Sequence, residues 1–370
     1  MVREESDSIP KTILYILFIL SEIPPIGVEF RCVCPEKLVV KSDYYSANKD
    51  PRSSEMKNIS LITVLSAAFI SSSVMAQSNR WTGSLQAGAG YWLGDATYSI
   101  GGHAWTPQEG SLHLPDKISE LSFPLDVACA SVGGNLVWKN RLEIFGTFTG
   151  NLTDPSSKMK DSDWGVFSDS GALDIYSESD AALKALSVDV GGRYWICPAN
   201  QTNRLVTSVG MGPSLLYQHL DWTLSNVDQW YPSHPRQAHD TQSGVVATYN
   251  TDVVMPYLEA CIIVRCKRLS GRAEAGLGLA LVQDEDNHIL RQRRSTATMA
   301  GFGTKLAAEL RYDLSRHLFI LANINALSIQ AMGTSKETGY SGNLTGYYSE
   351  IDETFSLTSL NGGLAAGWSF

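Results

Sequence analysis

Asp284, Asp286 and His288 alternate along the short segment Asp284-Glu285-Asp286-Asn287-His288. Alternate residues of a β-strand point to the same face, so a strand here would place two carboxylates and one imidazole side by side. An imidazole with an ordinary pKa of about 6.5 can take a proton from water near neutral pH. A neighbouring carboxylate can orient the ring and stabilise the imidazolium. These residue types and this spacing predict an acid–base site.

Asp161 and Asp163 form a second acidic pair with the same spacing. If this pair faces the first cluster, the two could hold and polarise one water molecule. The sequence has no Gly-x-Ser-x-Gly segment to supply a covalent nucleophile, so the predicted chemistry is hydrolysis by an activated water. The alternative is a metal site formed by Asp284, Asp286 and His288. It ranks lower because zinc sites built mainly from aspartate are uncommon.

Strands of alternating character are the elements that must position these clusters. Leu277, Leu279 and Leu281 alternate with small residues, and the last strand, 360–370, repeats this period of two. One face of such a strand suits lipid and the other suits a lumen. A soluble sandwich could show the same alternation, but it would not need so many glycine and aromatic residues. A strand that ends the chain on Phe370 resembles the C-terminal strand of bacterial outer-membrane barrels.

Short polar turns alternate with longer polar stretches, which is the pattern of periplasmic turns and extracellular loops in a barrel. Four turns and five loops join ten strands. The turns are 139–141, 198–203, 267–271 and 313–316, and the loops are about 100–116, 153–180, 223–243, 287–296 and 331–352. We therefore predict an all-β fold, a ten-stranded antiparallel transmembrane β-barrel with long extracellular loops.

Both acidic clusters belong at the extracellular mouth of this barrel. The seventh strand starts near Gly271 and runs outward, and its lumen-facing parity leads to Asp284, Asp286 and His288. Asp161 and Asp163 follow the third strand. Strands three and four of a ten-stranded barrel lie roughly opposite strands seven and eight, so the two clusters are expected to face each other.

Residues 1–76 differ from the rest of the chain. Met56-Lys57-Asn58, the apolar stretch 59–70 and the small residues up to Ala76 have the order of a signal peptide. We expect residues 1–55 to be an upstream misread start with no fold, 56–76 to be the signal peptide and 77–370 to form the outer-membrane barrel. A genuine N-terminal domain is the alternative for residues 1–55.

Composition excludes several classes of protein. The net charge of −9 argues against a nucleic-acid partner, which would require a basic face. The six cysteines follow no zinc-site spacing. After residue 76 no apolar run reaches the roughly 18 residues that a transmembrane helix needs.

Taken together, the motifs resemble those of the omptins, outer-membrane aspartyl proteases of Gram-negative bacteria. The resemblance covers nearly all of 77–370. The matching segments are Ile118-Ser119-Glu120-Leu121 with Gly133-Gly134-Asn135-Leu136-Val137-Trp138, Asp161-Ser162-Asp163-Trp164, Met255-Pro256-Tyr257 and Asp284-Glu285-Asp286-Asn287-His288.

This resemblance implies an outer-membrane endopeptidase that hydrolyses peptides or surface proteins near basic residues. It assigns Asp286 and His288 to a dyad that activates water and Asp161 and Asp163 to the facing couple. It places Asp284 in the substrate-binding pocket. It also implies no metal, contact with outer-membrane lipid and a monomeric protein.

Two positions depart from the family pattern. Tyr98 falls where the family has a pocket acid, which predicts a less acidic pocket and a weaker preference for Arg or Lys. Asp252 stands where the family has an arginine that grips lipopolysaccharide, so dependence on lipopolysaccharide is not carried over. The rival functions are an inactive omptin-like barrel acting as an adhesin or surface structural protein, a passive pore, and a lipid-modifying barrel enzyme.

Overall fold

The computed structural model describes residues 81–106, 109–167, 171–197, 206–339 and 350–370. The segments 1–55 and 56–76 and the predicted turn at 198–203 lie outside these residues. Within the described ranges, no helix is long and apolar enough to cross a membrane. The strands are β1 Trp81–Thr106, β2 Gly110–His113, β3 Ser119–Pro124, β4 Val127–Trp138, β5 Leu142–Asn151, β6 Met159–Trp164, β7 Leu173–Cys197, β8 Val206–Trp230, β9 Asp240–Cys266, β10 Leu269–His288, β11 Arg293–Asp313, β12 Leu318–Gly339 and β13 Glu350–Ser369.

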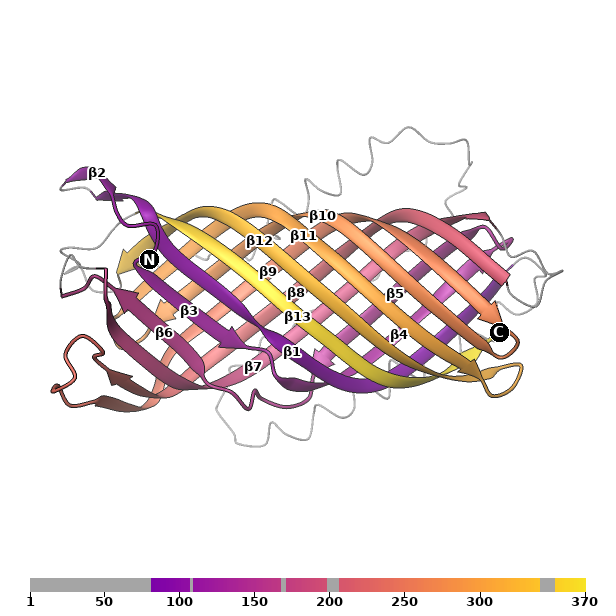
Figure 1. Ribbon diagram of the computed structural model, residues 1–370, viewed down its shortest axis with the longest axis horizontal. Coiled ribbons are helices and arrows are strands. Elements are labelled where there is room, and N and C mark those ends of the chain that lie inside the picture. The colour runs from indigo at the N-terminus through magenta and orange to yellow at the C-terminus, as the bar shows by residue number, and fades with distance from the viewer. Residues whose placement is uncertain (1–80, 107–108, 168–170, 198–205, 340–349) are drawn as a thin grey trace, which may run out of the picture. The chain divides into compact units, whose positions relative to one another are not determined.

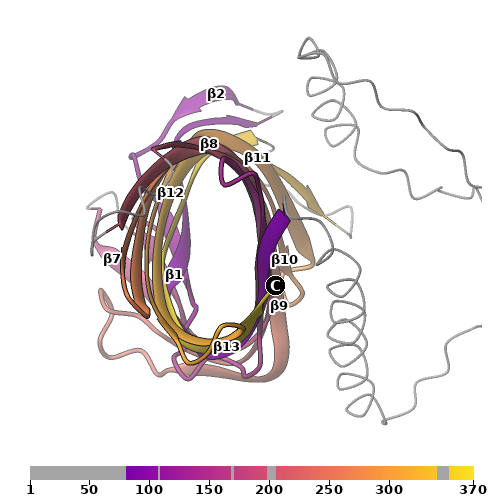
Figure 2. The same ribbon diagram turned by 90° about the vertical axis from the view of Figure 1, so that its right-hand side faces the viewer.

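Ten strands close into an antiparallel barrel, which confirms the predicted fold class. The hydrogen-bonded order is β1, β4, β5, β7, β8, β9, β10, β11, β12 and β13, and β13 pairs back onto β1. The strands are tilted in the side view (Figure 1), and the end-on view shows one closed ring (Figure 2). Closure leaves no unpaired edge in the wall.

At the end of the barrel away from Phe370, two wall strands are interrupted. β3 and β6 take over the places of β4 and β5 between β1 and β7. Pro124 ends β3, and proline has no N–H to donate to a ladder. Asp126 then accepts hydrogen bonds from the backbone N–H groups of Ser156 (3.1 Å) and Ser157 (3.0 Å), which fixes the bend before β6. The interruption gives β6 its own inward-facing surface at the mouth.

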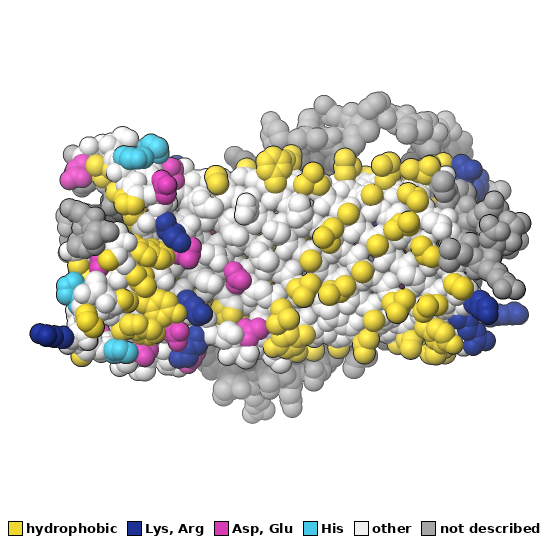
Figure 3. Space-filling view, in the orientation of Figure 1, with side chains coloured by type: hydrophobic (Ala, Val, Ile, Leu, Met, Phe, Trp, Pro, Cys, Tyr) yellow, Lys and Arg dark blue, Asp and Glu magenta, His cyan; other side chains and the backbone are white. Residues whose placement is uncertain are grey.

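Apolar side chains project outward along the part of the barrel near the short turns (Figure 3). On β10, Leu277 and Leu279 are 62% and 58% exposed, whereas Ala280 and Val282 are fully buried. This alternation is the lipid-facing band of an outer-membrane barrel.

The strands extend further than the sequence predicted. A strand crosses a membrane with about 9–11 residues, but the eight long strands contain 20 to 27. Much of the polar sequence expected in loops is therefore strand, and the expected loop at 287–296 is a tight turn between β10 and β11. The reason is that the outer face of a strand beyond the bilayer is wet, so the apolar alternation disappears while the ladder continues.

An apolar layer, here named the apolar plug, fills the lumen below the mouth. Its buried members include Trp92, Phe123, Leu216, Leu220, Trp222, Tyr249, Met255, Leu327 and Phe355. The rings of Phe123 and Tyr249 stack with centroids 4.2 Å apart. The plug supports the residues at the mouth from beneath.

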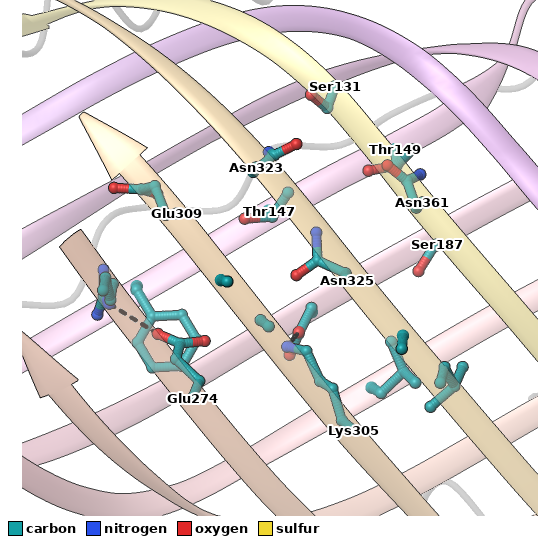
Figure 4. Close-up of a pocket in the computed structure, with 18 of the residues that line it drawn as sticks. Ser131, Thr147, Thr149, Ser187, Glu274, Lys305, Glu309, Asn323, Asn325 and Asn361 are labelled. Carbon is teal, nitrogen blue, oxygen red and sulfur yellow. Dashed lines mark hydrogen bonds and ion pairs between the residues drawn. The ribbon is translucent and has the colours of Figure 1, made fainter. Parts of the chain in front are cut away.

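A polar chamber of about 210 Å³ lies on the other side of the plug. Side chains of Asn323, Asn325 and Asn361 line it together with Lys305 and Glu309 (Figure 4). Beyond them, buried ion pairs around the guanidinium of Arg193 cross the lumen. The lumen is thus filled by side chains at two levels, as expected for a barrel of this size.

Because of this filling, we expect the protein to conduct no ions as a passive pore. When it is reconstituted in planar bilayers, the current trace should show no stable open steps at voltages that open porins. Stable porin-like current steps from the wild-type protein would contradict a sealed lumen and would favour the passive pore as the function.

Candidate functional site

β10 brings Asp284, Asp286 and His288 to the inner face of the mouth, as the alternation predicted. Asp284 and Asp286 are 7% and 5% exposed, and His288 is half-buried. β10 is held in register on both sides, with Asp286 opposite Tyr249 of β9 and Ser295 of β11. The cluster therefore sits on the rigid wall of the barrel.

Asp286 and His288 form a hydrogen-bonded pair. Nε2 of His288 lies 2.9 Å from Oδ2 of Asp286. Burial alone would lower the pKa of the imidazole, but the charge of Asp286 and its hydrogen bond outweigh burial and raise that pKa above its usual value. Burial alone would raise the pKa of Asp286, but the charge and hydrogen bond of His288, with the hydroxyl of Tyr98, hold it below its usual range.

Asp161 and Asp163 lie on β6 and face inward, as predicted. Strand pairing sets Asp161 in one row with Leu121 of β3 and Tyr98 of β1, next to the dyad. Burial, followed by the charge of Asp163, raises the pKa of Asp161 to about 7, and the charge of His288 opposes this rise. The two clusters predicted from separate segments therefore meet electrostatically at one site.

Asp284 belongs to a separate buried acidic pair beside the dyad. Its oxygens accept hydrogen bonds from the Tyr249 hydroxyl at 2.9 Å and from the backbone N–H of Ala297 at 3.1 Å. Its carboxyl also shares a hydrogen bond with Glu353 of β13, which is 4% exposed. Burial and the charge of Asp284 raise the pKa of Glu353, and burial raises the pKa of Asp284, so the pair binds a proton more readily than isolated carboxyls do.

Glu353 is the site residue that the sequence analysis missed. It lies just beyond the polar stretch 331–352 that was expected to be a loop, where no strand parity was assigned. The alternation of the apolar Ile351, Phe355 and Leu357 with polar residues is the sequence signal that would have placed Glu353 on the inward face. A second buried acid therefore lies beside Asp284, and it comes from another strand.

Two of the three arginines after His288 lie in the strand ladder and not in the loop expected at 287–296. Arg293 and Arg294 lie on β11, where Arg293 pairs with Glu337 and Arg294 pairs with Glu285. Arg291 is exposed in the turn and is near enough for its charge to act on His288 and Asp161.

The donor geometry gives no support to the alternative metal site. Across the described parts of the chain, no three His, Cys, Asp or Glu side chains are arranged to hold a metal ion. Asp286 is engaged by His288 and Tyr98, and Asp284 is engaged by Tyr249. These bonds direct the carboxylates to separate partners and not to one centre.

On the outer wall, Asp252 belongs to a small polar cluster. Its Oδ1 accepts a hydrogen bond from the Tyr217 hydroxyl at 2.7 Å and lies 2.9 Å from Nδ1 of His219. The carboxylate is an acceptor and carries the charge opposite to the arginine of the omptin pattern. It therefore cannot bind a lipid phosphate as that arginine would.

The closed ring, the lipid-facing band and the inward-facing carboxylate–histidine cluster define the class of the protein. It is an outer-membrane β-barrel of the Gram-negative type with an acidic cluster inside its extracellular mouth.

Among solved structures the chain is similar to the outer membrane protease OmpT from Escherichia coli. The TM-score is 0.63 at 16% sequence identity, over 80% of this chain and 99% of OmpT. It is also similar to the translocator domain of the autotransporter NalP from Neisseria meningitidis (TM-score 0.33, 10% identity, 84% and 96% of the two chains). OprG from Pseudomonas aeruginosa has a TM-score of 0.32 at 10% identity, over 78% and 96% of the chains.

No protein-family model matches the chain, and no curated protein matches it. The likeness to OmpT shows that the chain shares the fold of an outer-membrane β-barrel. The localisation that this fold defines is the outer membrane of a Gram-negative bacterium.

Proposed function

We propose that this barrel is an endopeptidase that hydrolyses peptides or surface proteins at the extracellular mouth with a water activated by His288. The observation that carries the proposal is the pair of His288 Nε2 and Asp286 Oδ2, 2.9 Å apart, beside the inward-facing Asp161. A histidine oriented by a carboxylate is the usual form of a general base.

The proposed reaction needs no covalent intermediate. Neutral His288 takes one proton from a water held by Asp161 and Asp163, and the oxygen of that water bonds to the scissile carbonyl carbon. Asp286 stabilises the imidazolium while it exists. The imidazolium then gives its proton to the leaving amine as the carbon–nitrogen bond breaks, so that the enzyme returns to its starting state.

We propose further that Asp284 and Glu353 select a basic side chain next to the cleaved bond. The two carboxyls share a hydrogen bond and come from β10 and β13, which are separated by two strands in the ring. An arginine or lysine bound there would displace the shared proton and form charge-assisted hydrogen bonds. The same negative field would draw cationic peptides toward the cleft.

Replacement of the pocket acids tests this selectivity. Glu353→Gln should lower kcat/KM about tenfold or more for a peptide with arginine before the cut, because one charged hydrogen-bond partner is lost. Hydrolysis of a matched peptide with norleucine should change little. Asp352→Asn is the matched control, since Asp352 is the neighbouring carboxylate on the exposed side and pairs with His103. Equal losses for both peptides in Glu353→Gln would rule out a role in selectivity.

An internally quenched cationic peptide, incubated with whole cells that display the protein, tests the proposed reaction. Cells with the wild-type protein should cleave it, and cells with the double variant Asp286→Ala/His288→Ala should not, at equal surface amounts. Binding of the peptide without cleavage by either form would indicate the adhesin instead. Cleavage should slow as salt is raised, because screening acts over about 8 Å at physiological ionic strength.

A further inference from the structure

Tyr98 contacts the dyad directly. The tyrosine lies on β1 and is 5% exposed, and its hydroxyl donates a hydrogen bond to Oδ2 of Asp286. That same oxygen lies 2.9 Å from Nε2 of His288. One carboxylate oxygen therefore serves two donors, one from each side.

We infer that Tyr98 is a positioning residue for the dyad. Its hydroxyl holds the Asp286 carboxylate in place and limits how strongly that carboxylate attracts the proton of His288. The inference rests on the proposed function, since it concerns the group that would activate water. It gives a specific role to a residue whose only expected effect was the loss of a pocket acid.

The ring of Tyr98 is fixed by the apolar plug. Its centroid lies 5.1 Å from that of Tyr249 and 6.1 Å from that of Phe123. On the strand ladder it pairs with Leu121 and Phe355. Because the ring cannot swing away, the hydroxyl stays aimed at Asp286. Burial and the charge of Asp286 raise the pKa of Tyr98, so the hydroxyl keeps its proton and acts as the donor.

A donated hydrogen bond weakens a carboxylate as a base. The charge on Asp286 is partly satisfied by Tyr98, so less of it stabilises the imidazolium of His288. Without the hydroxyl, His288 should hold its proton to a higher pH. It would then be a poorer base at the pH where the cell lives, because a smaller fraction of it is neutral.

Other titratable groups also lie around the dyad, and they stay unchanged when the Tyr98 hydroxyl is removed. They are Asp284 on β10, Tyr249 on β9, Asp161 on β6, Arg291 in the turn after β10, Arg293 on β11, Glu337 on β12 and Glu353 on β13. A difference between wild-type protein and Tyr98→Phe therefore reports on Tyr98.

The barrel supplies a matched control in Tyr249. Its ring packs against Tyr98, is also buried, and donates its hydroxyl at 2.9 Å to Oδ2 of Asp284 and not to Asp286. Tyr249→Phe removes the same atom from the same plug. Its effect should fall on the pocket acids and so on KM for a basic peptide.

Two readouts on the full chain in detergent micelles test the inference. In protein labelled with ¹⁵N-histidine, with the His288 signal identified by His288→Ala, the titration midpoint of His288 should rise by about one pH unit in Tyr98→Phe. It should not rise in Tyr249→Phe. In peptide hydrolysis, the acid limb of kcat, to which Asp161 also contributes, should move to higher pH in Tyr98→Phe. The value of kcat at about pH 6 should fall by up to about tenfold, with KM unchanged.

A second measurement should shift the His288 titration midpoint in the opposite direction. Incorporation of 3-fluorotyrosine into the Tyr249→Phe protein makes the Tyr98 hydroxyl a stronger donor, so the His288 midpoint should fall. An unmoved midpoint in both the phenylalanine and the fluorotyrosine proteins would overturn the inference. If the wild-type protein cleaves no peptide, the proposed function fails, but the titration still decides whether Tyr98 sets the proton affinity of His288.

Discussion

Replacing His288 by alanine should lower kcat/KM for a cationic peptide by about a thousandfold, because a positioned general base contributes roughly 10²–10⁴. The imidazole is the only group of the site whose ordinary pKa allows it both to take the water proton and to return it near neutral pH. Hydrolysis of a quenched peptide by purified protein in micelles measures the loss. Correct folding is checked by the faster migration of unheated barrel on gels.

The pH dependence provides an independent check on the same assignment. His288 must be neutral to act as a base, and its pKa is raised by Asp286, so activity should fall as the pH drops through that raised value. Asp161, with its pKa raised to about 7, also loses charge in this range, so the acid limb should reflect both groups together. Activity that persists unchanged in His288→Ala, with the same acid limb, would mean that another base operates.

Strand parity explains why much of the site could be predicted. Alternation with a period of two is enough to place Asp284, Asp286 and His288 on one face, and β10 has that period throughout. Asp161 and Asp163 followed from the same rule on β6. That the β10 cluster and the β6 pair face each other then followed from the number of strands in the closed ring.

The contacts between distant strands could not be predicted in this way. The hydroxyl of Tyr98 reaches Asp286 and the carboxyl of Glu353 reaches Asp284 across the lumen, so neither contact has a local pattern. The strand ends beyond the bilayer could not be predicted either, because their outer faces are polar and their sequence resembles that of loops. The contacts between distant strands therefore escaped prediction, whereas the placement of Asp284, Asp286 and His288 on one face of a strand was predicted.

The buried charges on the far side of the chamber should dominate the stability of the barrel. Arg193 is fully buried, and its guanidinium binds three carboxylates: Glu143 at 3.0 Å, Glu274 at 2.8 Å and Glu259. Arg272 joins the same network at 3.2 Å from Glu143 and 2.7 Å from Glu274. Two guanidinium groups thus bind three carboxyl groups where little water can replace a lost partner.

Arg193→Met should therefore lower the free energy of unfolding by about 3–5 kcal/mol, the range for removing one partner of a buried ion pair. Methionine preserves much of the packing against the rings of Phe145 and Trp195, whose centroids lie 4.7 Å and 5.5 Å from the guanidinium carbon, so the loss should be mainly electrostatic. Urea unfolding in micelles, followed by tryptophan fluorescence and by the heat-dependent shift on gels, measures it. Lys184→Met is the matched control, because Lys184 is 80% exposed and its pairing with Asp221 at 3.6 Å should contribute nothing measurable. If both variants unfolded at the same urea concentration as the wild type, the ion pairs around Arg193 would contribute nothing measurable to the free energy of unfolding. The stability of the barrel would then have to come from its strand ladder and the apolar plug.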